Sequence, residues 1–371
     1  MQPLVFKQST RKWVFLSALL GFAAFLLYLF FFTDIGGVVS VIGSTNLLIY
    51  GLAFLCVLAS VVFNTLSWHR LLANLAIKVN FRTAFNLSWV GIFVDAVIPG
   101  GWSGDLFKTY LLSRDPNVDG GRSASAIVLK NVLELLVVLG TSFLGLILLA
   151  LNYTLEGGVL MTIGTTMLLL TLPLIVIIYF STNLGATKKI LRAFKRLHAF
   201  IRRRPANIED FEAKIENTLQ EYHDGIVTFK TKPKALFQPV VFQITAWIFD
   251  LAALFLIFVS ISHPVPIDKI IITNTISVNF QTQGVALAGF AQLISVNIYK
   301  ILGILPSVSA ASTVLAGFAS FWFKLVIAYF AFQTVVFSRC IPPFCMRWSI
   351  FRGKSCKDET ANADKQPQIS T

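Results

Sequence analysis

The chain has 371 residues, of which 56% are hydrophobic and only 13% are charged. A soluble domain has roughly 25% charged residues, so this composition excludes a soluble globular protein and indicates an integral membrane protein. The net charge of +13 does not favour a nucleic-acid-binding protein, because the basic residues lie between apolar segments and not in one folded basic module.

Six apolar segments are each long enough to cross a bilayer, which takes about 20 residues of helix. In chain order they cover residues 13–32, 46–67, 123–151, 158–181, 235–262 and 307–337. Lysine and arginine are concentrated in alternate connections, including the long runs 188–234 and 339–365. Cytoplasmic loops are enriched in these residues. We therefore expect a multi-pass protein of the cell membrane with both termini in the cytoplasm.

An interrupted apolar segment, residues 83–112, follows the second predicted span. It contains the sequence IPGGWSGDLFKTYLL, whose break includes Pro99, Gly100, Gly101 and Gly104. Arg82 and Arg122 flank the segment and are both expected in the cytoplasm, so a single crossing does not fit. Irregular backbone at membrane depth is tolerated only where it is buried in protein or lines a cavity. The sequence therefore predicts a re-entrant helical hairpin that enters from the cytoplasm.

A second interrupted segment, residues 268–303, is predicted to be a re-entrant hairpin that enters from the outside. Its polar and glycine residues are Gln281, Gln283, Gly284, Gly289 and Gln292. The order of two spans, a hairpin and a span then occurs twice, in residues 1–152 and 153–337, before a cytoplasmic tail at 338–371 that we expect to be disordered. Each half has three crossings, which predicts an inverted repeat of the kind found in secondary transporters. The expected fold is an all-α polytopic membrane protein; an eight-span bundle with unrelated kinked helices is the alternative.

Ionisable residues within predicted spans mark cavities or partners, because a charge at the bilayer centre costs about 3 kcal/mol on insertion scales. A glycine-rich helix start presents free amides that suit a phosphate, and Lys108 and Lys130 would add positive charge. Asp105 is expected to cap those amides when no substrate is bound. The predicted headgroup pocket comprises Pro99, Gly100, Gly101, Gly104, Asp105, Lys108, Tyr110, Lys130 and Glu134. The alternative for Lys130 and Glu134, four residues apart, is a structural pair.

Three further features bear on function. Asp250 and Lys324 form either a structural bridge between helices or a coupling site with Asp250 as a proton carrier. The basic insertion 182–235 is predicted to form two amphipathic helices that adhere to anionic lipid. The four cysteines form no CxxC pair, so we expect no metal site, and no motif indicates a cofactor.

The sequence IPGGWSGDLFKTYLL resembles the signature of the flippase-like membrane domain of lysylphosphatidylglycerol synthases, which also forms the membrane half of some archaeal dolichyl-phosphate glycosyltransferases. The resemblance extends to LKNVLELL and to GVALAGFAQL and STVLAGFASFWF. The matching positions are Pro99, Gly104, Asp105, Lys108, Tyr110 and Glu134. The chain departs from the family where Lys130 and Asn131 replace an acid–arginine pair, Gln292 replaces an acid and Gly317 replaces an arginine.

The resemblance implies movement of a lipid with a charged or glycosylated headgroup between leaflets. We expect a flippase-like transporter of a phospholipid or a polyprenyl-phosphate-linked lipid and favour this over an enzyme. No P-loop sequence occurs, so an ion gradient or the membrane potential would drive it. The alternatives are a membrane-embedded enzyme acting on polyprenyl-phosphate lipids, or a non-catalytic partner of a soluble glycosyltransferase or synthetase.

Overall fold

The computed structural model describes residues 35–98, 103–115, 118–152, 208–282 and 290–340, together with the isolated positions 175–176 and 179. Throughout these ranges the regular structure is helical, and no strand occurs in them. The all-α prediction is therefore confirmed for the described part of the chain.

Four helical segments are long and apolar enough to cross a membrane. They are α3 (Leu47–Asn74), α6 (Gly120–Asn152), the run Pro233–Ser260 and the run Pro306–Val335. The third consists of η1 (Pro233–Leu236) and α10 (Phe237–Ser260), and the fourth contains α13 (Pro306–Gly317), η2 (Phe318–Trp322) and most of α14 (Phe323–Cys340). Four of the six predicted spans are thus confirmed. The segments 13–32 and 158–181 lie outside the described residues, apart from the three isolated positions.

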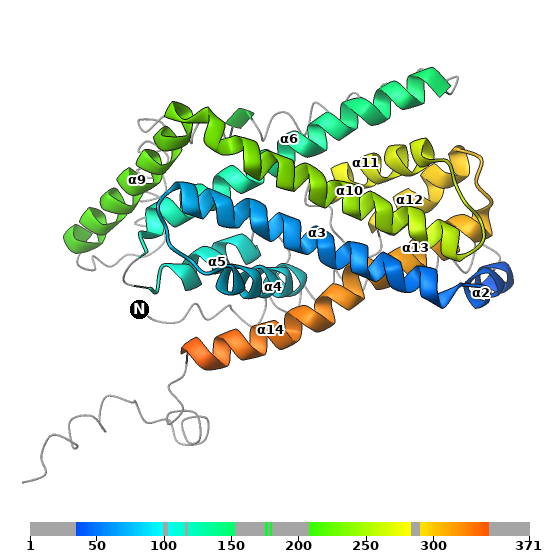
Figure 1. Ribbon diagram of the computed structural model, residues 1–371, viewed down its shortest axis with the longest axis horizontal. Coiled ribbons are helices and arrows are strands. Elements are labelled where there is room, and N and C mark those ends of the chain that lie inside the picture. The colour runs from blue at the N-terminus through cyan, green and yellow to red at the C-terminus, as the bar shows by residue number, and fades with distance from the viewer. Residues whose placement is uncertain are drawn as a thin grey trace, which may run out of the picture.

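Helices α3 and α10 form the antiparallel centre of the bundle and lie side by side along its length (Figure 1). At one end, the hydroxyl of Ser67 donates a hydrogen bond to the carbonyl oxygen of Pro239 over 2.9 Å. At the other end, the amide of Asn46 donates to the carbonyl oxygen of Ser260 over 2.7 Å. In addition, the Asn46 side chain caps α3 by accepting hydrogen bonds from two of its first amides. These bonds fix both the register and the direction of the two helices.

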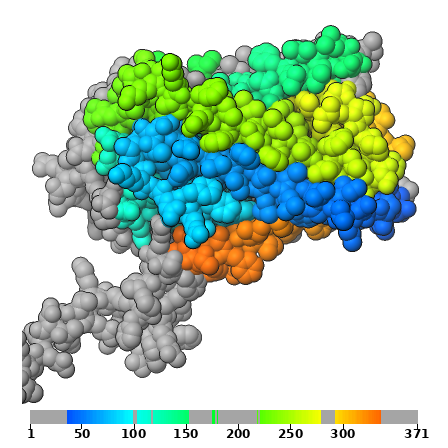
Figure 2. Space-filling view, viewed as in Figure 1, coloured from blue at the N-terminus to red at the C-terminus, as the bar shows by residue number. Residues whose placement is uncertain are grey.

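The outer face of α3 and α10 is apolar and fits contact with lipid. Figure 2 shows this face, on which the two helices run next to each other. The large apolar side chains exposed on it include Leu48, Leu52, Leu55, Ile244 and Ile248. Lipid chains are as apolar as these side chains, so exposing them to a bilayer carries no hydrophobic cost.

The two interrupted segments form helix pairs at opposite ends of the bundle (Figure 1). Helices α4 (Phe81–Val97) and α5 (Ser103–Leu112) pack together at the end where α3 finishes. Helices α11 (Ile267–Thr282) and α12 (Phe290–Ile301) pack together at the other end, next to α13 and the short α2 (Ile35–Gly43). Each interrupted segment thus contributes two helices that pack together, and their re-entrant character stays a prediction. The breaks themselves, residues 99–102 and 283–289, lie outside the described residues.

Each end of the bundle has its own apolar core. The core around α4 and α5 includes Trp68, Leu71, Leu87, Val90, Leu112 and Ile127, and the core around α11 and α12 includes Val57, Ile257, Phe258, Ile270, Tyr299 and Leu315. Large side chains of these cores are almost fully buried. The two helix pairs are thereby packed against separate parts of α3, α6 and α10.

The basic insertion contributes α9 (Ile208–Thr231), which packs against the start of α6. The Glu221 carboxylate accepts a hydrogen bond from the Gly121 amide over 3.0 Å, and Ile226 and Phe229 are buried. The second of the two predicted amphipathic helices is therefore present. Its buried apolar residues contact the protein, and the adhesion of its basic residues to anionic lipid stays a prediction. The first predicted helix lies outside the described residues, as does the tail beyond Cys340.

Candidate functional site

The start of α5 is held by an acid from the preceding helix. Oδ1 of Asp95 in α4 accepts hydrogen bonds from the amide of Gly104 over 2.7 Å and from the hydroxyl of Ser103 over 2.8 Å. A carboxylate at this place satisfies free amides and interacts favourably with the positive end of the helix dipole. The sequence predicts Asp105 as the cap, but the acid that accepts from the Gly104 amide is Asp95. Asp95 lies on the other side of the break, so residue spacing within α5 does not reveal it.

Close contact between glycines brings α4 and α5 together. A Cβ atom at Gly104 would overlap the carbonyl oxygen of Gly91 and crowd the Asp95 carboxylate. A Cβ atom at Gly91 would lie 3.0 Å from the Cδ and Cε atoms of Lys108. Gly104 therefore requires a residue without a side chain, whereas a side chain at Gly91 would require Lys108 to shift by a few tenths of an ångström.

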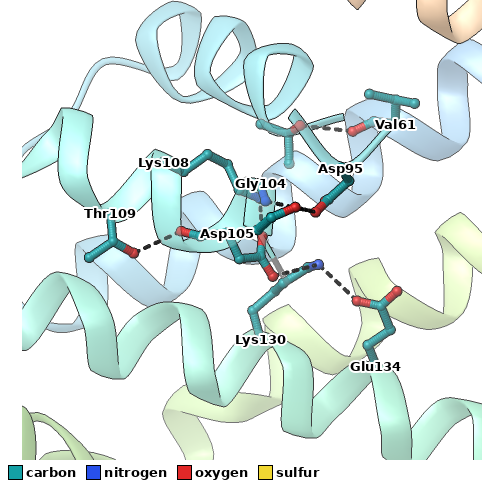
Figure 3. A network of polar contacts seen from close by, with 10 residues as sticks. Val61, Asp95, Gly104, Asp105, Lys108, Thr109, Lys130 and Glu134 are labelled. Carbon is teal, nitrogen blue, oxygen red and sulfur yellow. Dashed lines mark hydrogen bonds and ion pairs between the residues drawn. The ribbon is translucent and has the colours of Figure 1, made fainter. Parts of the chain in front are cut away.

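Asp105 joins the two predicted pocket lysines in one buried charge network (Figure 3). Lys108 forms an ion pair with Asp105 within α5. Lys130 of α6 lies with its Nζ atom 4.0 Å from Oδ2 of Asp105 and 2.8 Å from Oε2 of Glu134. Asp105, Lys108 and Lys130 are buried, whereas the side chain of Glu134 is 44% exposed. Four predicted site residues, on two different helices, are thus brought together.

The ammonium group of Lys108 also lies 5.2 Å from the centre of the Trp68 ring. An indole face attracts a cation, so Trp68 stabilises the charge of Lys108 in addition to Asp105. The sequence predicts an interfacial anchor at Trp68 but no contact of Trp68 or Gly91 with Lys108. The only sequence signals for them are an aromatic residue at the end of α3 and a glycine within α4.

The remaining predicted residues of the first pocket lie apart from this network or outside the described ranges. Tyr110 is 46% exposed, and its hydroxyl accepts a hydrogen bond from Arg114 over 2.7 Å. Gly104 acts in the helix contact described above. Pro99, Gly100 and Gly101 lie outside the described residues.

A cavity of about 430 Å³, lined by both polar and apolar side chains, lies next to the charge network, between α3, α6, α10 and the helices α11 to α14. Glu134 links the two, because it contacts Lys130 and also lines the cavity. Asp250, Lys324 and Gln292 line it as well. The other polar lining residues are Asn64, Gln243, Thr273, Asn274, Ser277, Ser295, Tyr299, Ser312, Thr313 and Ser320.

Asp250 and Lys324 share this cavity but form no ion pair as close as 4.0 Å in the described part of the chain. The hydroxyl of Ser60 lies beside Asp250. Lys324 is the second residue after η2, a single π-helical turn over Phe318–Trp322. Such turns are frequent at functional sites. The predicted close bridge is therefore not formed in this structure, and the prediction of a coupling role for Asp250 stays open.

The second helix pair contributes Gln292 to the cavity lining. A Cβ atom at Gly317 would lie 3.9 Å from the amide nitrogen of Gln292. These two positions are the ones where the resemblance implies an acid and an arginine, so both departures fall at one place in the fold. Gln281 lies in the last turns of α11, and Gln283, Gly284 and Gly289 lie outside the described residues.

The chain is similar to known membrane proteins. Residues 15–328 match the family described as the lysylphosphatidylglycerol synthase TM region. A UPF0104 membrane protein of Methanocaldococcus jannaschii is 25% identical over 316 residues, which cover 83% of this chain and 90% of that protein. A UPF0104 membrane protein of Methanothermobacter thermautotrophicus is 22% identical over 267 residues, covering 70% of this chain and 77% of that protein. The chain is therefore a multi-pass membrane protein that belongs to the lysylphosphatidylglycerol synthase TM region family.

Proposed function

We propose that the protein moves a phosphate-bearing lipid, either a phospholipid or a polyprenyl-phosphate-linked lipid, between the leaflets of the cell membrane. The observation that carries this proposal is the convergence of two buried lysines, Lys108 and Lys130, on the single carboxylate of Asp105. The ammonium groups come from different helices, and both lie inside a bundle of membrane-spanning length.

A lipid phosphate can replace Asp105 between these lysines. Phosphate oxygens accept charge-assisted hydrogen bonds from ammonium groups as carboxylates do. Burying an unpaired ion costs several kcal/mol, on the order of 3 to 5 when a partner is removed. The phosphate would pair with both lysines, and the displaced Asp105 would stay one helical turn from Lys108, so neither anion would lack a nearby cation.

The placement of the helix pairs supports transport across the bilayer. Arg82, Arg114 and Arg122 belong to the end that carries α4 and α5, and this end also holds the lysines around η1. By the positive-inside rule this end faces the cytoplasm. The first pair is then a re-entrant hairpin open to the cytoplasm and the second is one open to the outside, within six spans arranged as an inverted repeat. Transporters built in this way expose a midplane site to each side in turn.

A transport assay with reconstituted protein tests the proposal. Liposomes contain a phospholipid with a fluorescent headgroup, and a membrane-impermeant reductant quenches the outer leaflet. The wild-type protein should expose inner-leaflet lipid to the reductant, whereas Lys108→Met and Lys130→Met should abolish this exposure. Lys78→Met, at an exposed position of the same end, is the matched control and should retain it.

Equal rates for Lys108→Met and wild type would contradict the proposal. Chemical conversion of a polyprenyl phosphate by the purified protein would support the alternative of a membrane-embedded enzyme. Lipid movement or conversion that occurs only when a soluble glycosyltransferase or synthetase is added would support the alternative of a non-catalytic partner.

A further inference from the structure

We propose that the cavity next to the charge network binds an uncharged, hydroxyl-rich group, such as a sugar, that is attached to the lipid phosphate. This inference rests on the proposed function, because it places the phosphate at Lys108 and Lys130 and the attached group beyond Glu134. The cavity volume of about 430 Å³ lies within the range of roughly 300–1,000 Å³ that is typical of small-molecule sites.

The cavity presents hydrogen-bond acceptors whose partners the described residues do not supply. The side chain of Gln243 is 5% exposed, lines the cavity, and has an Oε1 atom without a hydrogen-bond partner among the described residues. A buried polar atom without a partner costs about 1–3 kcal/mol. Because this carbonyl oxygen can only accept, a bound group that donates to it would remove this cost.

Hydroxyl side chains on α13 and η2 add to the acceptor character. Thr313 donates its hydroxyl hydrogen to the carbonyl oxygen of Ser309 over 2.7 Å, as Ser312 does over 3.0 Å. Ser320 donates to the carbonyl oxygen of Ala316 over 2.6 Å. Each hydroxyl has one hydrogen, so what remains toward the cavity is oxygen lone pairs. A ligand with several hydroxyl groups supplies the donors that these oxygens lack.

The charges in and beside the cavity balance without a ligand. Three acids, Asp105, Glu134 and Asp250, stand against three lysines, Lys108, Lys130 and Lys324. Asp95 is compensated separately by the start of α5. The lipid phosphate already adds negative charge to this balanced set, so a second anion in the cavity would increase the imbalance, whereas an uncharged group adds none. Carboxamides of Asn64, Asn274 and Gln292 and the rings of Trp247 and Tyr299 complete a lining that can both donate to and stack on a sugar.

Binding to the full chain in lipid nanodiscs, prepared without glucoside detergents, tests the inference. The probes are two phosphodiesters with the same decyl chain and the same charge, one carrying glucose and the other a methyl group. The glucosyl lipid should bind about tenfold more tightly, a gain that corresponds to one or two net hydrogen bonds. Gln243→Met should remove this gain and leave binding of the methyl lipid unchanged. Gln238→Met, at an exposed position of the same helix, should keep the gain, and Ser320→Ala is a second cavity variant in case Gln243→Met does not fold.

The outcomes separate this inference from the proposed function. Equal binding of the two lipids by wild type, or a gain that persists in both cavity variants, would overturn the cavity assignment alone. Failure of both lipids to bind would overturn the phosphate site and the cavity assignment together. If methyl glucoside competes with the glucosyl lipid at an equal concentration, the cavity binds a soluble sugar, and the assignment to a lipid-linked group is overturned.

Discussion

The carboxylate of Asp95 and the amide of Gly104 are joined by a hydrogen bond of 2.7 Å across the break between α4 and α5. Removing the carboxylate leaves the first amides of α5 without this acceptor. Asp95→Ala should therefore lower the free energy of unfolding by about 1–2 kcal/mol. Asp95→Asn keeps an acceptor oxygen and should lower the free energy of unfolding by less than Asp95→Ala does.

Unfolding of the purified variants in detergent, followed by circular dichroism, measures this effect. Asp224→Ala is the control, because Asp224 lies exposed on α9 and pairs there with Gln220. If Asp95→Ala lowers the free energy of unfolding no more than Asp224→Ala does, Asp95 does not stabilise the start of α5.

Gly104→Ala should be strongly destabilising. Its methyl group would overlap the backbone of Gly91, and two packed helices cannot move apart without loosening the core around them. The expected loss is about 1–3 kcal/mol, as for other overpacked positions. Gly140→Ala is the matched control: Gly140 lies within α6 with nothing within 4 Å of an added Cβ atom, so alanine should be neutral or stabilising. The two unfolding transitions should shift in opposite directions, and a neutral Gly104→Ala would disprove the contact.

The charge network should respond to paired substitutions in a non-additive way. Asp105→Asn leaves Lys108 without its ion-pair partner and should destabilise the protein by roughly 3 kcal/mol. The double variant Asp105→Asn with Lys108→Met removes both charges and should recover part of that loss. A double-mutant cycle on the unfolding free energies measures the coupling. Strictly additive effects would show that the two charges do not interact.

Helix α9 should detach when its contact with α6 is widened. A Cβ atom at Gly225 would overlap the side chain of Ser125, which is fully buried. Gly225→Leu should therefore raise the hydrogen exchange of α9 by at least tenfold and leave α3 and α10 protected. Val227→Leu, at an exposed position on the same helix, should not change it. Unchanged exchange of α9 in Gly225→Leu would mean that the two helices are not held by this contact.

Much of the fold follows from local properties of the sequence. Long apolar runs predict α3, α6, α10 and the last span, because the length of a bilayer-crossing helix is fixed by geometry. Glycine and proline predict the break before α5, and the spacing of Lys130 and Glu134 predicts their ion pair, which is formed at 2.8 Å. These features depend on neighbours in the chain.

The parts of the candidate site that the sequence did not reveal depend on contacts between distant segments. Asp95 caps a helix to which it does not belong, and Trp68 contacts Lys108 from another helix. The cavity gathers side chains from α3, α6 and α10 to α14, so no single stretch contains it. Its only local signal is the run of small polar residues Ser307, Ser309, Ser312 and Thr313 in α13, a composition that equally well serves helix packing in membranes.

The proximity of Gln292 and Gly317 has a consequence for how related chains vary. An amide and a glycine stand at the two positions where the resemblance implies an acid and an arginine, so the two positions should change as a unit. Gly317→Arg alone would place an unmatched cation beside the cavity. Joint replacement with Gln292→Glu would restore neutrality. The pair can thus hold either a salt link or open space, and the choice sets how much room this side of the cavity offers.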